Sequence, residues 1–215
     1  DKLYNKQRHF VENAAHELQT PLAVCMNKLE LLSEHPDCTE DQLKEIAGLH
    51  QALNGIIRLN KSLLLLSRID NKQFPETRDI CLNHLIHKIL EGINDIYERK
   101  ALHLRVSEKE SLVCTMNESL ATTLITNLIK NAYVHNYEKG DIGITISRRM
   151  LTIANTGIDK TLDKELLFAR FASQSKQQES TGLGLAIVKS IVDLYSIRID
   201  YQYANGMHTF TLLFY

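Results

Sequence analysis

The sequence has little net charge, no closely paired cysteines and no long hydrophobic run, and each absence removes a class of protein. The formal net charge is −1, so no basic field favours a nucleic acid as the partner. The four cysteines form no C-x-x-C pair, which argues against a zinc site or a redox motif and favours reduced thiols. The longest apolar runs, such as Leu63 to Leu66, are far too short to span a bilayer.

The beginning of the sequence lacks the pattern of a signal peptide. It opens with Asp1, Lys2 and Leu3, a charged start with a helical pattern. From this start we expect the 215 residues to lie in the cytoplasm and to be part of a longer protein. The rest of that protein would hold a sensor or membrane spans, and such spans would anchor it in the cell membrane.

Two long helices with continuous apolar stripes are predicted for residues 1–72. The break at His35-Pro36 separates them, and Thr39 and Gln42 form a capping-box pattern at the start of the second helix. Two helices cannot cover apolar faces this wide, so the pattern predicts an antiparallel hairpin that dimerises into a four-helix bundle. The stripe of the first helix steps by four and three residues through Leu18, Leu22, Cys25, Leu29 and Leu32.

The rest of the chain has a different periodicity. Residues 73–78, which include Pro75, are predicted to be a linker, and residues 79–215 to be a second domain. There, helices capped by Asn83 and Asn117 alternate with short strands, and Asn205-Gly206 is a hairpin-turn signal. Mainly antiparallel strands interleaved with helices predict a two-layer α/β sandwich, and thus an α+β multidomain protein.

One candidate site lies in the first helix, between Phe10 and Leu22. The imidazole of His16 can act as a nucleophile at neutral pH, and the adjacent Glu17 can take its proton. Thr20 shares a helical face with His16, and Pro21 removes a backbone donor and should bend the helix there. A lone histidine on such a helix is more often a polar surface residue, but this combination favours a functional role.

Three candidate motifs lie in the second domain. Asn127 and Asn131 share a helical face, and their amide oxygens suit Mg²⁺, a metal that keeps few protein ligands. Residues 153–157 end a predicted strand. The glycines of the segment from Thr181 to Leu185 enter a helix, where backbone N–H groups can approach phosphates. Each motif alone also fits a plain structural reading.

Together the motifs resemble those of the sensor histidine kinases of two-component systems. Residues 10–22 resemble the phosphoacceptor motif F-x-x-x-x-S-H-E-L-R/K-T-P-L, with Ala15 and Gln19 as departures. Residues 127–136 resemble the N box, in which Val134 replaces a frequent basic residue. Residues 155–159 resemble D-x-G-x-G with two replacements, Asn155 and Asp159, and residues 182–185 resemble the last glycine box.

The resemblance implies a phosphoacceptor hairpin followed by an ATP-binding domain of the Bergerat (GHKL) type. It implies that His16 takes a phosphoryl group from ATP, that Glu17 is the base, and that Thr20 orients a water in a reverse phosphatase reaction. Asn131 would bind Mg²⁺, and the phosphoryl group would pass to an aspartate of a response-regulator receiver domain. The implied contacts to ATP are Asn127, Asn131, His135, Asn155, Gly157, Thr181, Gly182, Leu183, Gly184 and Leu185.

Two alternatives remain open at the level of the sequence. Asn155, Val134 and Asp159 all weaken the expected grip on the nucleotide, which would suit a kinase-weak phosphatase or a signalling scaffold. An ATPase of the same superfold that drives conformational change is the other alternative. The motif around His16 argues against it.

Overall fold

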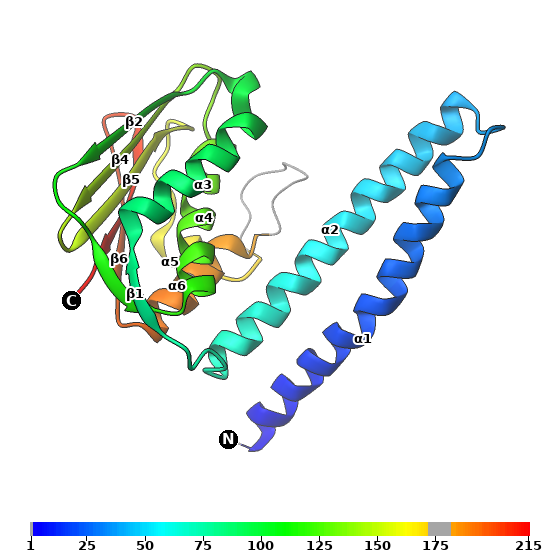
Figure 1. Ribbon diagram of the computed structural model, residues 1–215, viewed down its shortest axis with the longest axis horizontal. Helices are drawn as coiled ribbons and strands as arrows, with labels where there is room; N and C mark the ends of the chain where they lie inside the picture. Colours follow the sequence, from blue (N-terminus) through cyan, green and yellow to red (C-terminus); the bar gives the residue numbers. More distant parts are fainter. Residues whose placement is uncertain (1, 172–181) are drawn as a thin grey trace.

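The computed structural model describes the backbone of residues 2–171 and 182–215 and the side chains of residues 17–93, 96–171 and 182–215. Helices α1 (Lys2–Ser33) and α2 (Glu40–Asp70) form an antiparallel hairpin (Figure 1). The predicted capping box is confirmed, because Thr39 Oγ1 accepts from Gln42 N at 3.3 Å and Gln42 Oε1 accepts from Thr39 N at 2.9 Å. Helix α1 continues through Pro21 without interruption.

The hairpin buries only part of its apolar surface. Ile46 and Leu53 of α2 are half-buried on the hairpin. A second set of large apolar side chains is between 40% and 69% exposed, namely Leu18, Val24, Leu31, Leu32, Leu43, Leu49 and Ile56. None of the described helices is long and apolar enough to cross a membrane.

The second domain, from residue 78 onwards and called the sandwich below, has a sheet covered on one face by helices (Figure 1). The sheet order is β2-β4-β5-β7-β6; β2 and β4 are parallel and the other neighbours antiparallel. A separate two-stranded sheet pairs β1 (Arg78–Cys81) with β3 (Val113–Met116). The five strands are β2 (His103–Glu108), β4 (Asp141–Ser147), β5 (Met150–Thr156), β6 (Arg198–Ala204) and β7 (Met207–Leu213).

The core of the sandwich lies between this sheet and its three longer helices. Strand β4 alternates buried isoleucines with half-buried residues, so one face meets the helices. Register pairing places Ile144 opposite Ile153, and Ile153 opposite Phe210. The helices are α3 (Leu82–Tyr97), followed by the 3₁₀ turn Glu98–Lys100, α4 (Glu118–Val134) and α6 (Gly184–Leu194), and the short α5 is Lys164–Leu167.

Two of the predicted helix caps have different outcomes. Asn117 does cap α4, because its Oδ1 accepts from the backbone N–H groups of Ser119 and Leu120. The prediction for Asn83 is wrong, since α3 begins one residue earlier, at Leu82. Asn83 instead accepts from Leu112 N at 2.9 Å and so ties α3 to a segment 29 residues later in the sequence. Such a tertiary contact leaves no signal in the local pattern.

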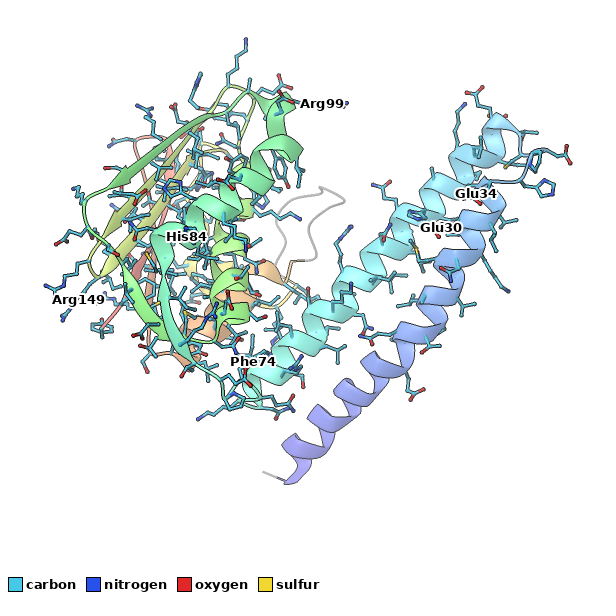
Figure 2. All side chains as sticks on the ribbon, viewed as in Figure 1. Glu30, Glu34, Phe74, His84, Arg99 and Arg149 are labelled. Carbon is cyan, nitrogen blue, oxygen red and sulfur yellow. The ribbon has the colours of Figure 1, made fainter. Side chains whose placement is uncertain are left out.

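The hairpin and the sandwich meet along the second half of α2. The buried Leu66 and Ile69 of α2 belong to the same apolar cluster as Ile187 of α6. At the end of this contact, Arg170 Nη2 donates to Asp70 Oδ2 at 3.0 Å. Figure 2 shows the side chains of the two domains in the same orientation as Figure 1. Helix α2 is thus both a member of the hairpin and a wall of the sandwich.

Candidate functional site

A cleft of about 330 Å³ lies where α2 faces the ends of α4 and α6. It collects residues from three separate parts of the sequence, and six of them belong to the predicted nucleotide contacts: Asn127, Asn131, His135, Gly182, Gly184 and Leu185. The other lining residues are Arg58, Lys61 and Ser62 of α2 and Lys130 and Val134 of α4. Two motifs about 50 residues apart in the sequence, the N box and the glycine box, therefore share one cavity.

The glycine box meets the N box at close range. A Cβ atom on Gly184 would lie 2.9 Å from Asn127 Oδ1, so any side chain at this position would displace the amide of Asn127. Asn127 is itself oriented by donation from its Nδ2 to Thr123 O at 2.8 Å. Leu183, the residue before α6, is fully buried and anchors the turn. The free N–H groups and the positive dipole end of α6 are thereby held beside the cleft, where an anion is favoured.

Asn155 and Gly157 lie at the end of β5 and do not line this cleft. Asn155 is only 3% exposed, and its Nδ2 donates to Thr156 O at 2.8 Å. Its Oδ1 has no hydrogen bond to any side chain or backbone group in the described part of the chain. A buried acceptor without a partner is costly and suits a donor from a ligand, such as the amino group of adenine.

The two predicted regions are nevertheless neighbours. A Cβ atom on Gly157 would lie 3.0 Å from the carbonyl oxygen of His135, a residue that lines the cleft. Desolvation lowers the pKa of His135, with smaller contributions from the charges of Lys100 and His208. The neutral imidazole is therefore favoured at this edge of the cleft.

His208 lies outside all of the sequence motifs. It lies opposite Asn155 in the β5–β7 register, and its Nε2 is 2.9 Å from Ile158 O. Because a carbonyl oxygen can only accept, Nε2 carries the proton, and in the neutral ring Nδ1 accepts from Tyr201 OH at 2.8 Å. The backbone N–H of Leu162 in turn donates to that hydroxyl at 3.2 Å. This chain of bonds fixes the turn that follows Gly157.

A second group that the motifs did not reveal holds α4 and β5 together. Thr156 Oγ1 donates to Asn136 Oδ1 at 2.6 Å and accepts from Asp141 N at 2.8 Å, and both side chains are buried. Lys100 Nζ donates to the carbonyls of Tyr133, Val134 and Asn136 at 2.8–2.9 Å. These donations satisfy carbonyls that the end of α4 leaves without helical partners. The N box is therefore rigidly placed relative to Asn155.

The remaining predicted residues lie elsewhere or outside the description. His16 is on α1, and its side chain and all of Thr181 lie outside the described residues. Glu17 and Thr20 are exposed on α1, and neither lines the cleft. Within the described ranges, no three or more His, Cys, Asp or Glu side chains form a metal-binding group. An ion that takes one amide oxygen together with phosphate and water oxygens does not need such a group.

Comparison with known proteins agrees with both halves of this arrangement. Residues 6–72 match the family described as His Kinase A (phospho-acceptor) domain. Residues 116–214 match the family described as Histidine kinase-, DNA gyrase B-, and HSP90-like ATPase. The two matches follow one another in the order that the motifs predicted.

Whole-chain relatives extend the likeness. The chain is 33% identical to the heme sensor protein HssS of Staphylococcus saprophyticus subsp. saprophyticus over 223 residues, which cover 99% of this chain and 47% of that protein. The HssS protein of Staphylococcus aureus (strain Newman) is 33% identical over 215 residues, covering 96% of this chain and 46% of that one. The chain thus spans about half the length of the curated relatives it matches.

Solved structures share the fold. The full-length ShkA structure in complex with AMPPNP has a TM-score of 0.74 at 16% identity and covers 96% of this chain and 46% of ShkA. The histidine kinase AdeS of Acinetobacter baumannii has a TM-score of 0.64 at 21% identity and covers 92% of this chain and 95% of AdeS. With a phosphoacceptor match followed by an ATPase-type match, the chain belongs to the sensor histidine kinase family.

Proposed function

We propose that this chain transfers the γ-phosphoryl group of ATP to His16 and then to an aspartate of a response-regulator receiver domain. One observation carries the proposal, namely that Asn127, Asn131 and Gly184 line a single cleft that is walled by the phosphoacceptor hairpin. A nucleotide held there lies next to the domain that contains the acceptor histidine. The match of residues 6–72 to a phosphoacceptor family supports the same assignment.

Different residues of the sandwich bind different parts of the nucleotide. Asn155 Oδ1, buried and without a partner in the described part of the chain, accepts from the adenine amino group. The N–H groups at the start of α6 and the amide of Asn127 face the phosphates. Asn131 would hold Mg²⁺, and the ion would neutralise part of the phosphate charge. This division fits the cleft, because Asn155 lies outside it and Asn131 lies within it.

His16 then acts as the nucleophile. Glu17 accepts the proton from the imidazole, and a ring nitrogen of His16 forms a bond to the γ-phosphorus. The bond from the γ-phosphorus to the β–γ bridging oxygen breaks, and ADP leaves with the electron pair. Holding both reactants in line supplies most of the acceleration in phosphoryl transfer.

Two features support the partners in this scheme. The apolar side chains that the hairpin leaves exposed, Leu31 and Leu49 among them, would be covered by the hairpin of a second copy in a four-helix bundle. Glu17 and Thr20 are exposed on α1, where a receiver domain can reach them and where Thr20 can orient a water for dephosphorylation. We further propose that the 215 residues of this chain are the cytoplasmic part of a longer, membrane-anchored sensor.

Incubation with γ-labelled ATP and Mg²⁺ tests the proposal. We expect acid-labile label on the wild-type chain, none on His16→Gln, and normal labelling on the control His35→Gln, whose side chain is exposed in the loop between the helices. Absence of label on the wild type overturns the kinase assignment and favours a phosphatase or scaffold. Phosphate release without any phosphoprotein favours an ATPase, and label that persists on His16→Gln overturns the acceptor.

A further inference from the structure

The cleft carries an excess of positive charge that the family motifs do not account for. Among the residues that the structure describes, its lining includes Arg58, Lys61 and Lys130 and contains neither aspartate nor glutamate. Arg58 and Lys61 are three residues apart on α2 and therefore lie on the same helical face. Both come from the hairpin and face the nucleotide-binding residues of the sandwich. The two domains thus contribute cations to one concave surface.

The two cations of α2 also differ from other basic residues of the same helix. Lys44 pairs with Glu40 at 3.1 Å, and the guanidinium of Arg68 lies over the ring of Phe74 at 4.9 Å. Arg58 and Lys61, by contrast, have no ion pair or hydrogen bond to any residue in the described ranges. Uncompensated cations that share a concave surface raise its potential and favour a bound anion.

The proposed position of adenine at Asn155 indicates which part of ATP enters the cleft. Asn155 lies outside the cleft, whereas Asn131 and the start of α6 lie within it. The adenine end is thereby separated from the cleft, and the phosphate end occupies it. The γ-phosphate must also point toward the hairpin, because His16 belongs to α1. Arg58 and Lys61 project from the hairpin side of the same cavity.

We propose that Arg58 and Lys61 of α2 bind the terminal phosphates of ATP, so that the hairpin forms part of the nucleotide site and the nucleotide joins the two domains. This inference rests on the proposed function, because it takes ATP as the ligand. The two cations supply charge at a site where this sequence has Val134 in place of a basic residue. ADP lacks the γ-phosphate and loses contacts to α2, which favours its release after transfer.

Equilibrium binding of ATP and ADP to the 215-residue chain in the presence of Mg²⁺ tests this inference. We expect Arg58→Ala/Lys61→Ala to weaken ATP about tenfold, the loss of roughly one charge-assisted hydrogen bond, and to weaken ADP less than about twofold. The matched control is Lys44→Ala, an exposed lysine on the same helix that does not line the cleft, and it should leave both affinities unchanged. Because Arg58 and Lys61 are exposed, their removal leaves the core intact.

A charge-retaining variant separates binding from a structural role. Arg58→Lys/Lys61→Arg should keep the preference for ATP over ADP, whereas loss of stability alone would weaken both nucleotides equally. Unchanged ATP affinity in the double alanine variant, or an equal loss for ADP, overturns the inference. If the wild type is labelled on His16 and the double alanine variant binds ATP as tightly as the wild type does, only the proposed role of Arg58 and Lys61 is overturned. If the wild type binds no ATP, the proposed function fails with it.

Discussion

In the hairpin, Leu31 and Leu49 are 69% and 57% exposed, whereas in the sandwich Leu120 and Leu124 are completely buried. The sandwich closes its apolar core with its own sheet and helices. The hairpin has only two helices, and its apolar side chains join a buried core only in the second half of α2, where the sandwich packs on it. The difference indicates that the sandwich is stable by internal packing, and it leads to the prediction that a further partner covers the exposed face of the hairpin.

The largest expected effect on stability comes from a substitution in the packed core of the sandwich. A Cβ atom on Gly140 would lie 2.1 Å from Asn136 Oδ1 and 2.4 Å from Thr156 Oγ1, both in the buried group that joins α4 to β5. Gly140→Ala should therefore lower the free energy of unfolding of the sandwich by about 3 kcal/mol, through overpacking and broken buried hydrogen bonds. Denaturant unfolding followed by circular dichroism measures the change.

The same substitution in the hairpin should have the opposite sign. Gly48 on α2 has no atom within 4 Å of the position of an added Cβ, so Gly48→Ala meets no obstacle. It should stabilise the helix by about 0.5–1 kcal/mol, because alanine loses less backbone entropy than glycine. Equal destabilisation by the two variants would contradict the contrast between a packed sandwich and an open hairpin.

The second prediction concerns what covers the exposed face of the hairpin. Leu49 and Ile56 are seven residues apart on α2 and are 57% and 49% exposed. If a second copy covers them, Leu49→Lys/Ile56→Lys should weaken dimerisation on the order of 100-fold, because two charges would be buried without partners. Sedimentation equilibrium measures the dissociation constant.

The matched control makes the same change on the sandwich. Ile158 and Leu166 are 59% and 51% exposed, so Ile158→Lys/Leu166→Lys adds the same charge to a surface of similar apolarity. This control should leave the dimer intact. A monomeric wild type, or a dimer broken equally by both double variants, would show that the hairpin face is not the interface.

The sequence alone allowed most of the fold to be predicted, where local chemistry decides it. The capping box at Thr39 and the cap at Asn117 are formed by residues within three positions of each other, and both are confirmed. The turn at Asn205-Gly206 is also confirmed, with positive φ at both residues. The role of Asn83 was mistaken because its partner, Leu112, is distant in the sequence and competes with the local capping pattern.

The candidate site, like the fold, could be predicted only where the sequence carries a local signal. Motif spacing indicated the N box and the glycine box, and both line the cleft. Nothing in the sequence indicated Arg58 or Lys61, since basic residues on an amphipathic helix usually face solvent. Their relevance depends on how α2 packs on the sandwich, which is a tertiary property. His208 was likewise invisible, because strand pairing places it opposite Asn155.

The third prediction tests whether adenine binds at Asn155 of the sandwich. Asn155→Asp replaces a neutral acceptor by a charged one and should tighten ATP binding about fivefold, since charge-assisted hydrogen bonds are stronger. Calorimetry measures the affinity. Inosine triphosphate is the control ligand, because its base has an oxygen in place of the amino group and should bind no more tightly to the variant. Equal or weaker ATP binding would count against the placement of adenine at Asn155.

The smallest expected effect is a pH dependence at the edge of the cleft. Desolvation, followed by the charges of Lys100 and His208, lowers the pKa of His135 below its ordinary value. The unfolded chain therefore takes up this proton at a higher pH than the folded chain does. The free energy of unfolding should consequently fall as the pH drops through about 6.5, and it should be insensitive to this group at higher pH.

His135→Gln removes the titrating group and should reduce that loss of stability between pH 7.5 and 5.5. The reduction should be less than about 0.5 kcal/mol, because the side chain is partly exposed and solvent screens its interactions. If His135→Gln leaves the acid sensitivity as it is in the wild type, the pH response does not arise at the junction of α4 with β5.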